Sequence, residues 1–196
     1  LELVSYARKN VQDIDFELLD VAADLHNVYR DITSSGNRKQ HNLTSKDFYF
    51  NEIQSINMIP DIVGISILFS SAYYSALELA KLLKIKWPHV TILAGGNHAT
   101  AFFKPMLEDP NIDLVFRGEA ETSLVEYLKK FKHSQVKNLN LSNILGVYDQ
   151  QKAKNIDKKN AESAVMLENL DEIGIPAFDL LNLEIYKKTT DFHGTG

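Results

Sequence analysis

The sequence contains no cysteine among its 196 residues. Disulfides, thiolate-bound iron–sulfur clusters and thiolate metal sites are therefore excluded from this chain. Long hydrophobic runs are also missing. The most apolar stretch, residues 62–69, is far shorter than the roughly 20 residues that a membrane-spanning helix needs. We therefore expect no membrane partner.

An excess of positive charge is missing as well. The chain has 21 Lys and Arg against 26 Asp and Glu, a net charge of −5. Because phosphate binding favours a basic surface, we expect no nucleic-acid partner. The first ten residues mix Glu2, Arg8 and Lys9 into an apolar pattern, which is not typical of a signal peptide, and we expect a cytoplasmic location.

What is present is an alternation of apolar strands and amphipathic helices. The clearest strand, residues 61–69, is apolar on both faces, which is typical of a central strand in a parallel sheet covered by helices. Further strands are predicted at 90–94 and 112–116, with helices from Ser70 or Ser71 and over 101–108 and 124–131. This order predicts an α/β fold, a Rossmann-like doubly wound parallel sheet with helices on both faces.

The two ends of the chain follow a different pattern. The spacing predicts a helix from Leu1 and a strand over 14–19, then a polar loop. Beyond residue 138 we expect a C-terminal β-hairpin, over 144–148 and 153–156, and then a linker. The chain therefore divides into a Rossmann-like domain, residues 1–137, and a hairpin and linker, residues 138–196.

Small and polar residues follow each predicted strand of the sheet. Ligands of open parallel sheets bind outside the carboxyl ends of the strands. This rule selects residues 66–71, 95–100 and 118–121. Adjacent glycines often form only a turn, and serines before a helix often serve only as caps. Three such segments on one edge nevertheless predict a ligand site, because glycine lets a ligand approach the backbone closely and hydroxyls can hydrogen-bond to it.

Three stretches, in this order and spacing, resemble the cobalamin (B12)-binding domain of B12-dependent (class B-like) radical SAM enzymes. They read PDIVGISILFSSAYYSALELAKLLK, ILAGGNHAT and IDLVFRGEAETSLVEYL. The resemblance extends outward through LELVSYARKN, ILGVYD and LENLDEIGIPAFDLL, the last of which resembles that family's linker into its radical SAM barrel.

The resemblance implies a set of cofactor-binding residues. Ser66, Leu68, Gly95 and Gly96 would line the slot for the nucleotide tail of cobalamin. Further candidates would face the corrin or its amide side chains: Asn97, His98, Ala99, Gly118, Glu119 and Glu121. Ser70 and Ser71 are candidates because their hydroxyls lie at a predicted helix N-terminus. Tyr74 is a candidate to pack on the corrin face, with ordinary helix packing as the alternative. The family usually has glycine where this chain has Ala120. No catalytic residue and no metal ligand is predicted.

Three histidines bear on cobalt ligation. Methionine-synthase-like domains use the histidine of Asp-x-His-x-x-Gly in a loop after the first strand. A partial match at His26 and a full match at His193 lie at other places in the chain, and we interpret both as coincidence. His98 is on the sheet edge, where we expect hydrogen bonding rather than cobalt ligation.

The resemblance implies a cobalamin carrier within a radical SAM enzyme, most simply a methyltransferase. A 4Fe–4S cluster and S-adenosylmethionine would be bound by a radical SAM barrel, in cis or in trans, because the cluster's Cys-x3-Cys-x2-Cys motif is absent here.

Two alternatives remain. One is a vestigial scaffold that no longer binds cobalamin; Ala120 and the lack of the family's first strand before Leu1 favour it. The other is a receiver or nucleotide-binding domain, which lacks support from G-x-G-x-x-G or from an acidic cluster.

Overall fold

A sheet of four strands organises the computed structural model, which describes residues 1–21, 45–133, 141, 143–184 and 186. The strand order is β1-β2-β3-β4. The first three strands are parallel, and β4 is antiparallel to β3. Their bounds are β1 Ile62–Ser66, β2 Thr91–Gly95, β3 Leu114–Phe116 and β4 Val147–Tyr148.

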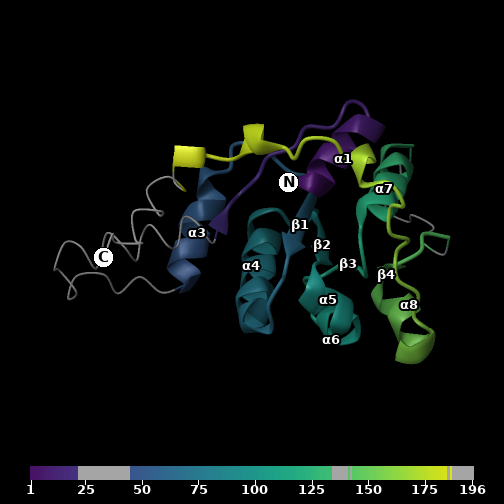
Figure 1. Ribbon diagram of the computed structural model, residues 1–196. Helices are drawn as coiled ribbons and strands as arrows, with labels where there is room; N and C mark the ends of the chain where they lie inside the picture. Colours follow the sequence, from purple (N-terminus) through teal and green to yellow (C-terminus); the bar gives the residue numbers. More distant parts are fainter. Residues whose placement is uncertain (22–44, 134–140, 142, 185, 187–196) are drawn as a thin grey trace, which may run out of the picture.

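Helices cover both faces of the sheet (Figure 1). One face carries α4 (Tyr73–Lys86), α5 (Asn97–Ala101) and α6 (Phe103–Glu108), with α3 (Ser45–Ser55) against α4 and α8 (Gln150–Lys154) against α6. The other face carries α1 (Glu2–Asn10) and α7 (Glu121–His133). The α/β fold class is thereby confirmed. None of the helices in the described part of the chain is long and apolar enough to cross a membrane.

Alternate residues of each strand enter two separate cores. In β2, Ile92 and Ala94 pack beneath α4 and α6, whereas Leu93 packs toward α1 and α7. Both sets are buried. This two-sided burial explains why the strands read as continuous apolar runs.

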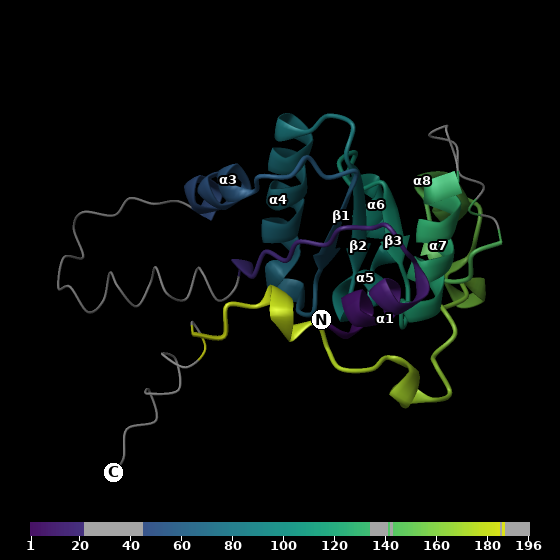
Figure 2. The ribbon, with the colours of Figure 1, turned by 90° about the horizontal axis from the view of Figure 1, so that it is seen from above.

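The strand predicted over 14–19 is not formed. These residues have no strand partner among the described residues; they cross the α1/α7 face of the sheet (Figure 2). Ile14 and Phe16 pack into the core beside α1 and α7, which accounts for the alternating pattern without β-pairing. Lys132 fixes the preceding turn, because its Nζ lies 2.7 Å from Asp13 Oδ2.

The predicted hairpin over 144–156 is also wrong. β4 pairs with β3 instead of with the segment that follows it, and residues 150–154 form α8. The side chain of Asp149 caps this helix by accepting a hydrogen bond from Lys152 N at 2.7 Å. Lys152 Nζ then donates to Val147 O at 2.8 Å, which holds the helix against the end of β4.

Burial of Tyr127 predicts a loss of stability at alkaline pH. Burial raises the pKa of the Tyr127 phenol from 10.0 to about 12, against the opposing effect of its hydrogen bond with Thr91. The unfolded chain therefore loses this proton first, and the stabilisation declines between about pH 10 and 12 by roughly 2–3 kcal/mol. In urea titrations, Tyr127→Phe should show a shallower decline over this range. An equal decline in both proteins would contradict this assignment.

Candidate functional site

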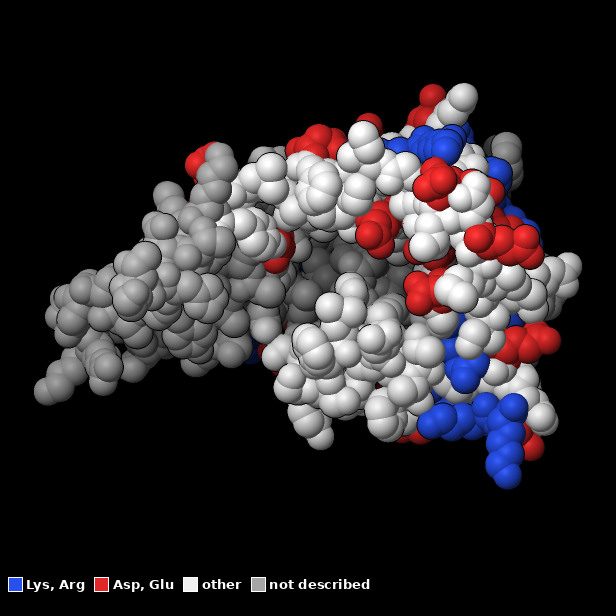
Figure 3. Space-filling model, in the orientation of Figure 1, with Lys and Arg blue, Asp and Glu red and all other residues white. Residues whose placement is uncertain are grey.

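The three segments selected from the sequence lie together at the carboxyl edge of the sheet. The hydroxyl of Ser70 and Nδ1 of His98 are 2.9 Å apart, which joins the segment after β1 to α5. Gly118 N donates to Thr100 Oγ1 at 3.0 Å, which joins the turn after β3 to α5. Figure 1 looks onto this edge, and Figure 3 shows that the surface there is hollowed beside the ends of β1 and β2.

Two glycines leave the sheet uncovered beside this hollow. A Cβ added to Gly95 would meet no atom within 4 Å, and the same is true of Gly64. Ser66 is paired with Gly95 and Gly64 with Leu93, and Leu93 faces α1 and α7. Gly64, Ser66 and Gly95 therefore share that face of the sheet, and we call these three residues the shelf.

Gly64 was missed by the sequence analysis. The signal that could have found it is the period of two along a strand, which puts residue 64 on the same face as Ser66. A side chain at position 64 would point into open space, although Ile62, Val63 and Ile65 of the same strand are apolar.

The other glycines of the edge serve the fold. Gly96 has φ +91°, and a Cβ there would lie 2.7 Å from the carbonyl oxygen of Ile67. Gly118 has φ +90°, and its Cβ would lie 2.9 Å from Cβ of Ser163. Close approach of the protein's own chain therefore requires both glycines. Of the predicted glycine pair, Gly95 is the residue that leaves room for a ligand.

His98 is buried, at 8% exposure, in a small aromatic cluster. Its ring stacks on Phe102, with centroids 4.8 Å apart, and lies 5.1 Å from Tyr73. Ser70, predicted as a helix cap, makes no side-chain capping bond and instead holds Nδ1 of His98. Nε2 of His98 is buried and has no hydrogen-bond partner in the described part of the chain. Such an unmet polar atom costs about 1–3 kcal/mol, so it is a candidate to bind a ligand group.

Large apolar side chains are exposed around the same edge. Leu68 and Phe69, from the loop after β1, are 56% and 72% exposed, and Tyr74 is 80% exposed. Phe102 is 45% exposed and ends α5. Exposed apolar groups at one edge make this surface a candidate to bind an apolar ligand.

The remaining predicted residues differ in their exposure. Ser66, Ser71, Asn97 and Glu119 are exposed, and Glu121 is half-buried at the start of α7. Ala99 is fully buried in the core beneath the edge, away from the surface.

The structure describes Ala120 but neither of the two histidines found in Asp-x-His patterns. Ala120 packs against the α7 core, and its carbonyl oxygen accepts from Leu124 N at 2.7 Å. His26 and His193, with their Asp-x-His patterns, lie outside the described residues.

Comparisons with known proteins show what the domain that carries these residues is similar to. Residues 52–128, which span β1 through most of α7, match the model of the B12-binding domain family. An uncharacterized methyltransferase of Pyrococcus horikoshii is 36% identical over 148 residues, 73% of this chain and 30% of that protein.

Two further relatives match this chain over shorter alignments. Cytidylyl-2-hydroxyethylphosphonate methyltransferase of Streptomyces wedmorensis is 40% identical over 70 residues, 36% of this chain and 13% of that protein. Anaerobic magnesium-protoporphyrin IX monomethyl ester cyclase of Cereibacter sphaeroides is 35% identical over 74 residues, 37% of this chain and 12% of that protein. The chain thus spans less than a third of the length of these relatives. Residues 52–128 form a cobalamin-binding domain of the B12-binding family.

Proposed function

We propose that this chain holds cobalamin at the carboxyl edge of its sheet for a larger radical SAM methyltransferase. The observation that carries the proposal is the shelf of Gly64, Ser66 and Gly95. It lies within the segment that matches the B12-binding family, and open space lies above both of its glycines.

The chemistry of this edge fits cobalamin in three respects. The shelf offers a strip of sheet on which Ser66 carries the only side chain, and this open backbone suits a nucleotide tail lying against it. Exposed apolar side chains, Leu68 and Tyr74 among them, suit the body of a corrin ring. The buried and unpartnered Nε2 of His98 suits an amide group, which can both donate and accept hydrogen bonds.

Each residue then has a role in binding and orientation. Ser66 and Gly95 would hold the nucleotide tail, and Gly96 would keep the β1 and β2 ends close together. Asn97 and His98 would contact the amide side chains from α5. Glu119, in the turn after β3, and Glu121, at the start of α7, would do so from the other side.

When bound, cobalamin supplies a cobalt centre that can carry a methyl group. This chain would bind and orient it and exclude water from it. The 4Fe–4S cluster and S-adenosylmethionine would lie elsewhere in the parent protein or on a partner, since this chain has no cysteine. The names of two relatives support methyl transfer, and the name of the third is that of a cyclase.

Two broader expectations remain proposals. One is the division of the chain into a Rossmann-like domain, residues 1–137, and a second part, residues 138–196. β4 lies beyond that boundary and pairs with β3. Ala164, also beyond it, donates its N–H to Arg117 O at 2.8 Å, so the second part packs on the first. The other is the cytoplasmic location.

Incubation with hydroxocobalamin tests the proposed function. The 196-residue chain is mixed with excess hydroxocobalamin, with and without oxygen, and desalted before its visible spectrum is recorded. Retention of about one corrin per chain is the expected result. A colourless protein would favour the scaffold alternative. A nitrogen-ligated cobalt spectrum that disappeared in His193→Ala would overturn our interpretation of that histidine.

A further inference from the structure

Residues 169–181 are fastened to α1, and we call this segment the clasp. Ser5 Oγ lies 2.6 Å from the carbonyl oxygen of Ile175, to which its hydroxyl donates, and 3.1 Å from that of Ile173. Lys9 Nζ donates to Glu172 O at 3.0 Å. Arg8 Nη1 lies 2.7 Å from Asp179 Oδ2. The segment read from sequence as a linker therefore has a defined place on the domain.

The clasp lies at the carboxyl edge of the sheet. In Figure 2 it passes beside α1 at the end of the sheet where β1 and β2 finish and α5 begins. In the orientation of Figures 1 and 3, the clasp and α1 lie on one side of the hollow, and the start of α4 and α5 lie on the other. The clasp is thus placed opposite the segments that follow β1 and β2.

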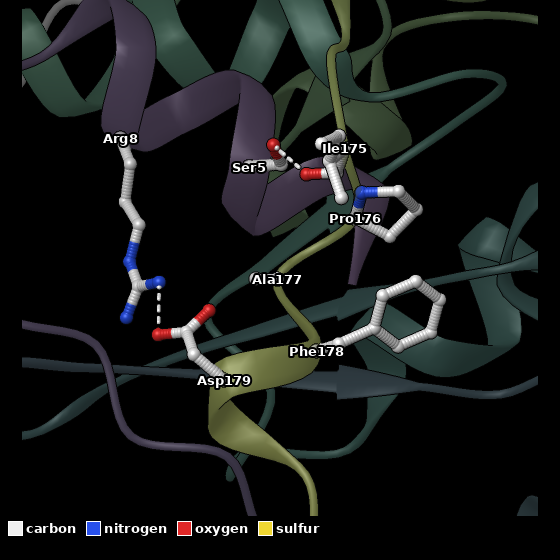
Figure 4. Close-up of a pocket in the computed structure, with 7 residues that line it drawn as sticks. All are labelled: Ser5, Arg8, Ile175, Pro176, Ala177, Phe178 and Asp179. Atoms are coloured by element: carbon white, nitrogen blue, oxygen red, sulfur yellow. Dashed lines mark hydrogen bonds and ion pairs between the residues drawn. The ribbon is translucent and has the colours of Figure 1, made fainter.

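A cavity of about 370 Å³ lies between α1 and the clasp (Figure 4). Ser5 and Arg8 line it from α1, and residues 175–179 line it from the clasp. Its size is within the range of small-molecule sites. The Arg8–Asp179 pair places N–H donors and carboxylate acceptors together, the combination that primary amides recognise.

The clasp also exposes apolar side chains beside this cavity. Ile175 is 82% exposed and Phe178 is 48% exposed, although both belong to a segment held by several hydrogen bonds. A corrinoid has the matching chemistry, with an apolar ring edge and primary amide side chains. The apolar and polar groups of the clasp lie on the same edge as the site already described.

We propose that the clasp is a second wall of the cobalamin site, with Ile175 and Phe178 against the corrin edge and Arg8 and Asp179 beside its amides. This inference rests on the proposed cobalamin binding. It has a structural consequence: bound cobalamin contacts α1 and the clasp together and restrains the path of the chain leaving the domain.

Two measurements test the clasp on the full 196-residue chain. The first is amide hydrogen exchange of residues 173–181 with and without saturating hydroxocobalamin, where slower exchange is expected in the complex. The second is the hydroxocobalamin Kd of Ile175→Asp, which should rise about tenfold because a charge replaces an apolar contact. Ile85→Asp is the matched control, an exposed isoleucine at the far end of α4, and its Kd should not change.

The outcomes separate this inference from the proposed function. One contrary result is that the unsubstituted chain binds hydroxocobalamin with unchanged exchange in the clasp, and another is that Ile175→Asp binds with an unchanged Kd. Either result would overturn the proposed role of the clasp and leave cobalamin binding intact. Failure of the unsubstituted chain to bind hydroxocobalamin would overturn both.

Discussion

Replacing Gly95 with leucine is expected to abolish retention of cobalamin while leaving the fold intact. No atom lies within 4 Å of a Cβ at this position, so a side chain there begins in open space, and we expect the free protein to accommodate it. The backbone of Gly95 is that of an ordinary strand and not left-handed, so a side chain causes no strain. The leucine occupies the space above the shelf, and we expect the hydroxocobalamin Kd to rise at least about a hundredfold.

Absorbance titration measures this loss, and thermal unfolding shows whether the fold survives. The melting temperature of Gly95→Leu should stay close to that of the unsubstituted chain. Gln151→Leu, on the exposed face of α8, adds the same side chain at a distance from the edge and should bind normally. Tight binding by Gly95→Leu would show that the shelf is not part of the site.

Replacing Gly146 with alanine is expected to destabilise the protein strongly. Gly146 has φ +75°, and a Cβ there would lie 2.3 Å from Ala164 N and 2.7 Å from Arg117 O. Both neighbours are backbone atoms in a hydrogen-bonded arrangement, in which Arg117 N donates to Gly146 O at 2.7 Å. They cannot move aside independently. We expect a loss of about 3–5 kcal/mol in the free energy of unfolding.

Gly174 supplies a matched control for this effect. It has nearly the same backbone conformation, φ +80°, but a Cβ there would approach nothing closer than Ser5 Oγ at 3.9 Å. Gly174→Ala should therefore lower the free energy of unfolding by only about 1–2 kcal/mol, because alanine disfavours the left-handed backbone conformation. Urea unfolding of the two variants measures the difference. Equal losses would show that the close approach of residues 117, 146 and 164 does not limit stability.

The parallel core could be predicted because its strands carry a strong signal. β1 and β2 are apolar on both faces, and only burial between two layers of helices explains that pattern. The segment over 14–19 shows the limit of the argument. Alternate burial of Ile14 and Phe16 needs an extended chain on an apolar surface and does not need a neighbouring strand.

The structure of residues 144–156 was harder to predict, because a strand there can pair with a neighbouring segment or with a strand far away in the sequence. Ala153 and Ile156 suggest a hairpin strand, but the Asp149 cap starts a helix at Gln150 that covers Ala153. The partner of β4 is β3, about thirty residues earlier, which no local turn signal reveals.

The grouping of the three selected segments at one edge was predictable, and the contacts of their individual residues were not. The rule for parallel sheets selects that edge from strand ends alone. It does not distinguish Gly95, which faces open space, from Gly96, which meets the carbonyl of Ile67. Nor does it reveal that Ser70 holds His98 instead of capping a helix, or that Ala99 is buried. These roles depend on which atoms approach from other elements.

Comparison of hydroxocobalamin with a cobinamide tests the central claim most directly. A cobinamide keeps the corrin ring and lacks the nucleotide tail, so it leaves the shelf of Gly64, Ser66 and Gly95 unused. Equilibrium dialysis of the unsubstituted chain should give one hydroxocobalamin per chain and a cobinamide Kd at least about tenfold higher. Equal affinity for the two, or no binding of either, would contradict the account.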